Sequence, residues 1–252
     1  MKTDSFAIAQ SQLTREPSDT AAEPDKKVNY VRRLFSEGPD EYDFLLKILS
    51  LGRDNYWRRS MVQKAESRES NMVLDIACGT GLVTYSFAKT GAYVVGIDVT
   101  REMLKHAIEL REYRIFDVDF ILARAENLPL QPDVFDASTI SLALRNVSSQ
   151  VETLSEMRRC TKKGKPVMSL DFARPRGHLF KPFYRFYIFR VLPTFGLVIS
   201  KHWKVIFLYL ANSIEKSRDP ERIKETMECI GLNDSSVKRM THGTTALVSG
   251  IK

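Results

Sequence analysis

One short stretch, Val73 to Gly81, constrains the fold of this chain more than any other. It reads Val-Leu-Asp-Ile-Ala-Cys-Gly-Thr-Gly, an apolar run that carries a carboxylate and is followed by a glycine turn. A helix-like segment, Leu82 to Lys89, comes next. A strand, a glycine turn and a helix in this order form the first βα unit of doubly wound nucleotide-binding sheets. Glycines suit such a turn because a ligand can approach a backbone that carries no Cβ atoms.

The spacing of the glycines bears on which nucleotide binds. A dinucleotide-binding turn has a third glycine, and this chain has Thr84 in its place. The dinucleotide pattern has no role for Asp75, four residues before Gly79, whereas a carboxylate there suits a ligand with a cationic end. The pattern Asp-x-x-Cys-Gly-Thr-Gly resembles motif I of Rossmann-like methyltransferases. It favours S-adenosylmethionine as the ligand, with Asp75, Gly79 and Gly81 at its site.

A second acidic residue, Asp98, ends the apolar run Tyr93 to Ile97, about twenty residues after the glycine turn. An acidic side chain at this distance can accept hydrogen bonds from both ribose hydroxyls of a nucleotide. The alternative is an N-cap, because residues 100–111 have the pattern of a helix. Met103 lies one helical turn further on, either against the adenine ring or in the core.

The loop after the third predicted strand supplies further expected contacts. That strand covers Val118 to Leu122, and Arg124 and Ala125 follow it. In doubly wound sheets ligands bind at the carboxyl ends of the strands. Backbone groups of Arg124 and Ala125 can therefore contact the edge of the adenine ring.

Hydrophobic periodicity completes an α/β domain, and a chain of 252 residues suits one such domain. The expected fold is a Rossmann-like class I methyltransferase fold, a mostly parallel seven-stranded sheet with helices on both faces. The predicted strands are Met72–Ala77, Tyr93–Ile97, Val118–Leu122, Ala137–Leu142, Pro166–Phe172 and an antiparallel hairpin of Ser236–Met240 with Thr245–Ile251.

The two ends of this domain differ in composition. Residues 1–26 are polar and rich in acidic side chains, so they fit neither a secretory signal nor a mitochondrial presequence and are predicted to be a disordered tail. Residues 27–252 form the predicted methyltransferase domain. Within it, residues 27–70 have helical patterns and either cover the ligand cleft as a lid or pack on the sheet edge.

A basic aromatic insertion, residues 173–216, follows the fifth predicted strand. Residues 173–214 of this insertion include no Asp or Glu and carry seven cations. The charge of this segment therefore equals the net charge of the whole chain, +7. These cations are Arg174, Arg176, Lys181, Arg185, Arg190, Lys201 and Lys204. Aromatic rings among cations suit an anionic membrane surface, stacking on RNA, or a helical cover over an apolar pocket. We expect an apolar pocket that faces a membrane, and no nucleic acid.

The cysteines and the apolar runs bear on location. Cys78, Cys160 and Cys229 are widely spaced and give neither a disulfide framework nor a zinc pattern, so no metal is expected. No run approaches the roughly 18 apolar residues of a membrane-spanning helix. The sequence predicts a cytoplasmic protein that can bind peripherally to a membrane.

Several motifs in order resemble the ubiquinone/menaquinone biosynthesis C-methyltransferase family, from about Val28 to the C-terminus. The segments are Tyr42-Asp43, Leu51-Gly52 and Trp57-Arg58-Arg59, then Thr139 to Val147, Leu170 to Pro175, Tyr209 to Ile214, and Thr241 to Lys252. The chain departs from the family's usual residues on the acceptor side, with Asp171 for Glu and Phe207-Leu208 for Tyr-Arg. It also has Leu82 where the family usually has Asp.

This resemblance implies C-methylation of a prenylated quinol, of the demethylmenaquinol or ubiquinol-precursor type, with S-adenosylmethionine as methyl donor. It assigns donor contacts to Thr80, Asp98, Arg124, Ala125 and Ser141. A different lipid-like phenol or small molecule, or a cofactor-binding scaffold of a quinone-synthesis complex, stays open. So does a homodimer.

Three residues are candidates for the chemistry. Arg145 follows an apolar strand end, where a buried cation can stabilise a developing phenolate, although it could instead form an ion pair that holds the strand end. Asn146 could orient a hydroxyl group of the acceptor. Tyr209 could relay a proton, or it could simply pack in the insertion.

The alternative of a nucleic-acid methyltransferase lacks its motifs. Amino-methylating enzymes of that kind carry an Asn/Asp-Pro-Pro-aromatic motif after the fourth strand, where this chain has Ser141 to Leu144. RNA cytosine-C5 enzymes need a cysteine directly after a proline, and none of the three cysteines follows one.

Overall fold

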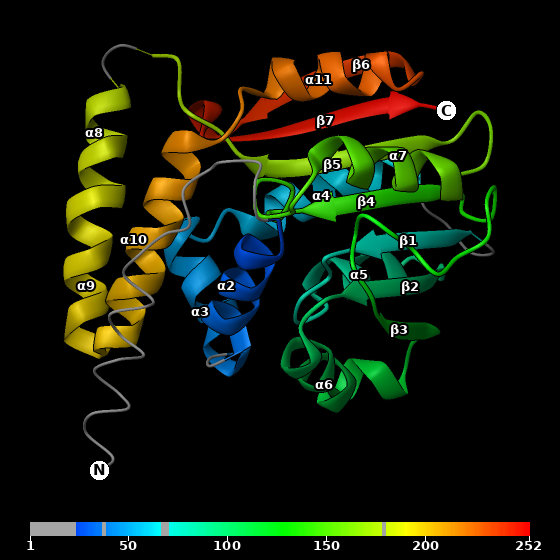
Figure 1. Ribbon diagram of the computed structural model, residues 1–252. Helices are drawn as coiled ribbons and strands as arrows, with labels where there is room; N and C mark the ends of the chain where they lie inside the picture. Colours follow the sequence, from blue (N-terminus) through cyan, green and yellow to red (C-terminus); the bar gives the residue numbers. More distant parts are fainter. Residues whose placement is uncertain (1–23, 37–38, 67–70, 178–179) are drawn as a thin grey trace.

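The computed structural model describes residues 24–36, 39–66, 71–177 and 180–252 (Figure 1). One seven-stranded sheet runs through the molecule with helices on both faces, which confirms the predicted Rossmann-like fold. The first helix in the described part of the chain, α2, covers Pro24–Ser36. The predicted tail of residues 1–26 is therefore too long, because its last three residues are helical; residues 1–23 lie outside the described ranges.

The strands of the sheet follow the order β3-β2-β1-β4-β5-β7-β6. They are β1 (Met72–Ile76), β2 (Tyr93–Asp98), β3 (Val118–Leu122), β4 (Ala137–Ser141), β5 (Pro166–Phe172), β6 (Asn233–Met240) and β7 (Thr245–Ile251). The first five are parallel, and β7 is antiparallel to both β5 and β6. The strand order reverses between β1 and β4, which is where doubly wound sheets bind their ligands.

Burial explains why these segments form strands. Val73, Leu74 and Ile76 of β1 are at most 1% exposed, and Ile140 of β4 is fully buried. Parallel strands covered on both faces have continuous apolar runs, as β1 does apart from its carboxylate. The prediction for β6 begins three residues late, at Ser236, because a bulge between Asn233 and Ser236 breaks the alternation at its start.

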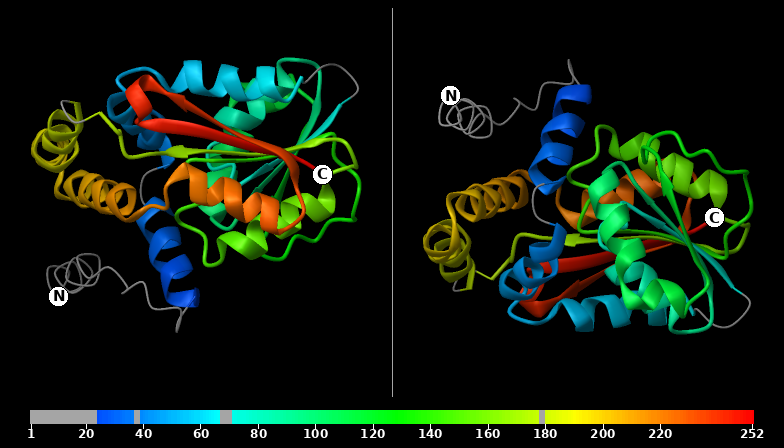
Figure 2. Two further views of the ribbon diagram at one scale, coloured as in Figure 1. Left: turned by 90° about the horizontal axis from the view of Figure 1, so that it is seen from above. Right: turned by 90° about the horizontal axis from the view of Figure 1, so that it is seen from below.

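Helices form a layer on each face of the sheet, as Figure 2 shows. One layer includes α4 (Asp54–Lys64) and α5 (Leu82–Ala88), and the other includes α7 (Gln150–Cys160) and α11 (Pro220–Cys229). The N-termini of α7 and α11 are both capped. The Ser149 hydroxyl accepts from the Glu152 N–H, and the Asp219 carboxylate accepts from the Glu221 N–H. Pro220 occupies the first turn, as predicted.

The helix predicted over residues 100–111 is shorter than expected. It forms α6 (Arg101–Glu109) and ends because Leu110 has an extended backbone, with ψ of 147°. A short 3₁₀ turn, η1 (Arg111–Arg114), follows it. Another 3₁₀ turn, η3 (Thr241–Gly243), joins β6 to β7.

Two helical groups stand at the carboxyl ends of the parallel strands. The first is α2 with α3 (Pro39–Leu49), and the second is the insertion. The insertion forms α8 (Phe180–Phe186), a π-helical turn η2 (Tyr187–Val191), α9 (Leu192–Ile199) and α10 (Lys201–Lys216). These two groups frame the region where the site lies.

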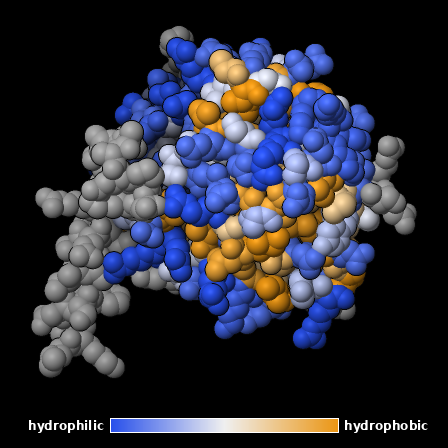
Figure 3. Space-filling model, turned by 45° about the vertical axis from the view of Figure 1, so that its right-hand side comes forward, coloured by the Kyte–Doolittle hydropathy of each residue, from blue (hydrophilic) through white to orange (hydrophobic). Residues whose placement is uncertain are grey.

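The surface turned toward the viewer in Figure 3 is largely hydrophilic, with an apolar area near its centre. Across the described ranges, every helix is either too short or too polar to span a bilayer.

A glycine allows α9 to pack closely on α10. A Cβ atom at Gly196 would lie 2.7 Å from the Phe207 ring and 2.9 Å from the Lys204 nitrogen. The Phe207 ring is buried and cannot move into solvent, and the Lys204 atom is a backbone nitrogen of α10. The hairpin of α9 and α10 therefore depends on the missing side chain.

We predict that Gly196→Ala destabilises the protein by about 1–3 kcal/mol through overpacking. In an unobstructed helix the same change would stabilise by about 0.5–1 kcal/mol, so the sign of the effect is informative. Urea unfolding followed by circular dichroism measures it. Gly177→Ala is the control, because its Cβ would meet its nearest neighbour at 3.8 Å. An alanine variant at 196 as stable as the wild type would contradict the packing argument.

Candidate functional site

A pocket lies at the carboxyl ends of β1, β2 and β4, beneath α2 and α3. It contains about 1000 Å³ of unoccupied space, part of it open to solvent. A smaller cavity adjoins it behind the glycine turn. The large pocket has a polar end at the turn and an apolar end beneath the helices.

The structure brings most of the expected donor-binding residues to the polar end. Those that line the large pocket are Gly79, Asp98, Met103, Arg124, Ala125 and Ser141. Asp75 and Thr80 line the smaller cavity, which Gly79 and Ser141 also border. Gly81 lines neither cavity.

The two glycines of the turn have different roles. Gly79 has a φ of +56°, and a Cβ there would meet no atom within 4 Å, so the turn presents its bare backbone to open space. Gly81 has a φ of +84°, and a Cβ there would lie 2.8 Å from the Tyr85 ring. Gly79 leaves room for a ligand, whereas Gly81 is required by the backbone shape and by Tyr85.

Asp98 joins the glycine turn to the start of α6. One carboxylate oxygen accepts from the Gly79 N–H at 2.9 Å, and the other accepts from the Thr100 N–H at 2.8 Å. Burial raises the pKa of Asp98, and these N–H donors oppose the rise. The N-cap of α6 is Thr100, so Asp98 is not the cap residue itself. Its carboxylate borders the pocket, where it can accept further hydrogen bonds.

Two residues without the freedom of glycine adopt the left-handed region here. Ala77 has a φ of +53° and Leu142 a φ of +56°. They follow β1 and β4, the neighbouring strands on either side of the strand-order reversal. Such a conformation costs roughly 1–2 kcal/mol for each residue. Both line the pocket, so the strain coincides with the site.

Asp75 is fully buried and is held by two threonines. The Thr84 hydroxyl donates to it at 2.7 Å from α5, and the Thr139 hydroxyl lies 3.2 Å away on β4. Burial raises the pKa of Asp75 to about 7. The hydrogen-bond partners of Asp75 in the structure are thus the two threonines, and its contact with the methyl donor stays a prediction.

The glycine turn is also tied to α3. The Thr80 hydroxyl donates to Asp43 at 2.7 Å, and burial raises the pKa of Asp43. The neighbouring Tyr42 lines both cavities, and its ring packs edge-on against Phe35 at 5.7 Å between centroids. Sequence reasoning did not assign Tyr42 or Asp43 to the site. The available signal was their position in a family motif.

The remaining wall of the pocket is apolar. Val31 and Phe35 come from α2, and Leu45 comes from α3. Phe172 at the end of β5 and Leu210 of α10 also line the pocket. Helices of the predicted lid and of the insertion thus enclose one apolar chamber next to the polar end.

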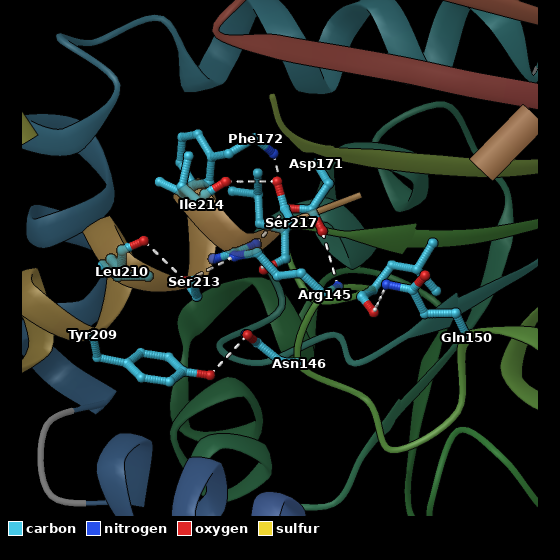
Figure 4. A network of polar contacts seen from close by, with 12 residues as sticks. Arg145, Asn146, Gln150, Asp171, Phe172, Tyr209, Leu210, Ser213, Ile214 and Ser217 are labelled. Carbon is cyan, nitrogen blue, oxygen red and sulfur yellow. Dashed lines mark hydrogen bonds and ion pairs between the residues drawn. The ribbon is translucent and has the colours of Figure 1, made fainter. Parts of the chain in front are cut away.

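Arg145 lines the pocket, and its guanidinium is held on several sides (Figure 4). Nη1 donates to the Leu142 carbonyl at 2.6 Å and forms an ion pair with Asp171. Nε donates to the Ser213 hydroxyl at 3.3 Å, and the cation lies 5.3 Å from the Phe172 ring centroid. The ion pair expected as the alternative role of Arg145 is present, and Arg145 also lines the pocket.

Asn146 and Tyr209 form a pair (Figure 4). The Tyr209 hydroxyl donates to the Asn146 side-chain oxygen at 2.9 Å, and Asn146 lines the pocket whereas Tyr209 does not. Because its oxygen is engaged, the Asn146 amide can donate its N–H groups toward the pocket. Tyr209 acts here as a positioning residue, and its role as a proton relay stays a prediction.

The side chain of Arg124 is engaged by neighbouring residues. It donates to the Ser148 hydroxyl at 3.2 Å and lies 3.6 Å from Glu126, and the expected backbone contact of Arg124 with a ligand stays a prediction. Within the described ranges, no three His, Cys, Asp or Glu side chains are grouped so that they could hold a metal ion.

Sequence comparisons with known proteins agree on one family, and a solved structure shares the fold. Residues 23–252 match the sequence model of the ubiE/COQ5 methyltransferase family. The chain is 34% identical to the ubiquinone/menaquinone biosynthesis C-methyltransferase UbiE of Marinomonas sp., over 90% of this chain and 92% of that protein. It is 33% identical to the demethylmenaquinone methyltransferase of Streptomyces avermitilis, over 92% and 99%. The crystal structure of a SAM-dependent methyltransferase from Aquifex aeolicus superposes with a TM-score of 0.57 at 16% identity, over 77% and 88%.

The raised pKa of Asp75 yields a prediction about stability. The folded pKa of about 7 exceeds the ordinary value of 3.8, so the folded protein holds this proton more tightly than the unfolded chain does. The stabilisation that this bound proton gives the folded protein is fully present below the ordinary pKa of Asp75, and it is lost as pH rises through the folded pKa. From about pH 4 to pH 7, Asp75 should lower the unfolding free energy by roughly 2–4 kcal/mol.

We predict that Asp75→Asn removes this slope, because an amide does not titrate. Urea unfolding at a series of pH values, without added ligand, gives the difference between wild type and variant. Asp117→Asn, a change at an exposed position, is the control and should keep the wild-type slope. Parallel pH profiles for Asp75→Asn and wild type would show that the carboxyl of Asp75 does not titrate in this window.

Proposed function

The chain belongs to the ubiE/COQ5 methyltransferase family, and from that membership we propose that it methylates a ring carbon of a prenylated quinol. It is an S-adenosylmethionine-dependent methyltransferase. Two relatives, at 33–34% identity over nearly all of this chain, are named for ubiquinone/menaquinone and demethylmenaquinone methylation. The observation that carries the acceptor class is an apolar chamber with Arg145 and Asn146 at its inner end.

The polar end of the pocket fits the methyl donor. Gly79 leaves open space beside its backbone, and Asp98 offers a carboxylate where ribose hydroxyls would lie. Asp75 and Asp43 add further carboxyl groups around the same turn. S-adenosylmethionine, when bound, supplies an electrophilic methyl group on a cationic sulfur. Acidic groups on this side of the pocket suit that positive charge.

The apolar end of the pocket fits an aromatic acceptor with a hydrocarbon substituent. Phe35, Leu45 and Leu210 come from three different helices and form its wall. Wall residues of this kind exclude water and favour apolar surface. A quinol ring that carries a prenyl chain matches a chamber that is apolar except at its inner end.

The inner end can stabilise negative charge on an acceptor oxygen. Carbon methylation requires an electron-rich ring, which a quinol provides when a hydroxyl group loses its proton. Arg145 is fixed by Leu142 and Asp171, so its guanidinium need not reorganise as that charge develops. Asn146, oriented by its bond to Tyr209, can donate a second hydrogen bond.

Tyr42 is a further candidate for donating a hydrogen bond to the acceptor. Burial raises the pKa of Tyr42 to about 12, and the charge of Arg145 opposes the rise. The hydroxyl therefore stays protonated at neutral pH, where it can donate a hydrogen bond but does not act as a base. Asp171, which pairs with Arg145, does not line the large pocket and so has a positioning role.

The proposal is tested with the purified protein, methyl-labelled S-adenosylmethionine and a demethylated prenylated quinone in detergent. We expect labelled product, identified by mass, when the acceptor is chemically reduced, and much less when it is oxidised. The same ring without a prenyl chain should react more weakly. Donor binding without transfer to any quinol would contradict the proposal and support a scaffold. Label only in an unrelated phenol would contradict the acceptor class.

We predict that Arg145→Ala lowers kcat by about 10²–10³-fold, the loss typical of removing a preorganised oxyanion donor. The Kd of S-adenosylmethionine, measured by calorimetry, should stay nearly unchanged because the Asp98 end of the pocket is intact. Ser213→Ala is the matched control, with little loss of activity expected, because it removes the contact to Nε and the Ser213 hydroxyl's own hydrogen bond to the Leu210 carbonyl but leaves the contacts of Nη1 in place. Equal losses in kcat and donor binding would make Arg145 a structural residue.

A further inference from the structure

The helical column formed by α8, η2 and α9 lies at the edge of the molecule. In both views of Figure 2 it stands apart from the sheet, with α10 between it and the rest of the domain. No residue of α8 is buried. The column therefore has one side packed on the protein and another turned to solvent.

The packed side of the column contacts α10 and α3, two helices that line the pocket. Ile188, Leu192 and Gly196 are buried on this side. The Tyr187 hydroxyl donates to the Ile48 carbonyl of α3 at 2.8 Å. Tyr184 and Tyr187 are partly buried and pack against the hydrophobic core.

The solvent side of the column is apolar. Of the fifteen large apolar side chains that are exposed in the described chain, eight lie between residues 180 and 199. Phe183 is 72% exposed, Phe186 62% and Val198 82%. Exposed apolar groups gathered on one element mark an interaction surface, in contrast to the single ones scattered over most proteins.

Helical spacing places five of these eight side chains along one ridge. The five residues are Phe183, Phe186, Val191, Phe195 and Val198. Steps of three or four residues keep side chains on the same side of an α-helix. The single step of five, from Phe186 to Val191, coincides with the π-helical turn η2, whose repeat is longer. We call these five side chains the outer ridge.

Cations flank the outer ridge, and acidic residues do not occur between residues 180 and 199. Lys181, Arg185 and Arg190 are exposed on the column. Arg185 lies 3.3 Å from Glu215 of α10, so its charge is partly offset. Lys181 and Arg190 extend the cationic character to both ends of α8 and η2.

We propose that the outer ridge docks this protein on an anionic lipid bilayer, with the phenylalanine and valine side chains in the interface and the cations at the headgroups. An apolar ridge flanked by lysine and arginine is the pattern of surface-bound amphipathic helices. A second copy of this chain is a poorer partner, because symmetric pairing would bring the same cations together. The proposal rests on the proposed function in one respect, that a prenylated acceptor resides in a bilayer.

Docking through this column would place the site next to its substrate. The column's outer side would lie in the headgroup region while Tyr187 on its inner side is hydrogen-bonded to α3, a helix that lines the pocket. A prenylated quinol could then enter the apolar chamber without exposing its chain to water. The column thus links the membrane surface to the acceptor end.

The test uses the full chain and vesicles that lack quinones, so that binding is independent of the proposed reaction. Vesicles contain phosphatidylcholine alone or with phosphatidylglycerol, and co-sedimentation gives the bound fraction. We expect binding to the anionic vesicles that weakens with added salt. The pair Phe183→Ser and Phe186→Ser should lose at least tenfold in affinity. The pair Lys181→Gln and Arg190→Gln should lose about fivefold for each charge on anionic vesicles.

Matched control variants change exposed residues outside the insertion. Ile115→Ser removes an apolar side chain that is 61% exposed, and Lys105→Gln removes a cation whose side chain is 75% exposed. Neither should change vesicle binding. All variants should keep the wild-type affinity for S-adenosylmethionine and the wild-type rate on a detergent-solubilised acceptor, because the outer ridge does not line the pocket.

Several outcomes would overturn the proposal. They are failure of the wild type to bind anionic vesicles, equal loss of binding in the control variants, or a change from dimer to monomer in the ridge variants by sedimentation velocity. Methyl transfer in detergent without vesicle binding removes the docking surface and leaves the proposed function. Vesicle binding without transfer to any quinol removes the proposed function and leaves the docking surface.

Discussion

The carboxyl group of Asp75 is the point on which the centre of this structure depends. It joins β1 to α5 through Thr84 and to β4 through Thr139, at the place where the strand order reverses. A buried carboxyl in a sheet is costly unless its oxygens find donors, and these two hydroxyls supply them. The strand ends that carry the glycine turn and the acceptor residues are held together there. Burial keeps the pKa of Asp75 high, which ties the site's framework to pH.

The acceptor end is built by contacts between distant parts of the chain. Arg145 is held by Asp171 of β5 and Ser213 of α10, which lies 68 positions away. Asn146 is oriented by Tyr209 of the same helix. The insertion therefore does two things, since it closes the apolar chamber and fixes the polar groups at its inner end. Its outer ridge gives the same helices a place at a membrane in the proposed arrangement.

Much of the fold could be predicted from the sequence, because each strand and most helices are encoded by neighbouring residues. The runs around Leu74 and Ile140, and the caps at Ser149 and Asp219, specify their elements locally. The prediction was wrong where a local irregularity hid the pattern, at the bulge of β6 and at the extended backbone of Leu110. The residues that line the polar end of the pocket were predictable for the same reason, since a strand, a turn and the next strand carry most of them.

The sequence by itself determined the family fold, the glycine turn and the positions of Asp75 and Asp98, because these depend on spacing along a short stretch of chain. Only the tertiary structure decided that Gly81 serves packing and that Asp43 holds Thr80. Tertiary structure also decided the setting of Arg145, which forms the ion pair with Asp171 and also lines the pocket, while its catalytic role stays a prediction. The physical reason is that a side chain's role is set by the groups that face it, and those groups come from elements that chain order does not place together.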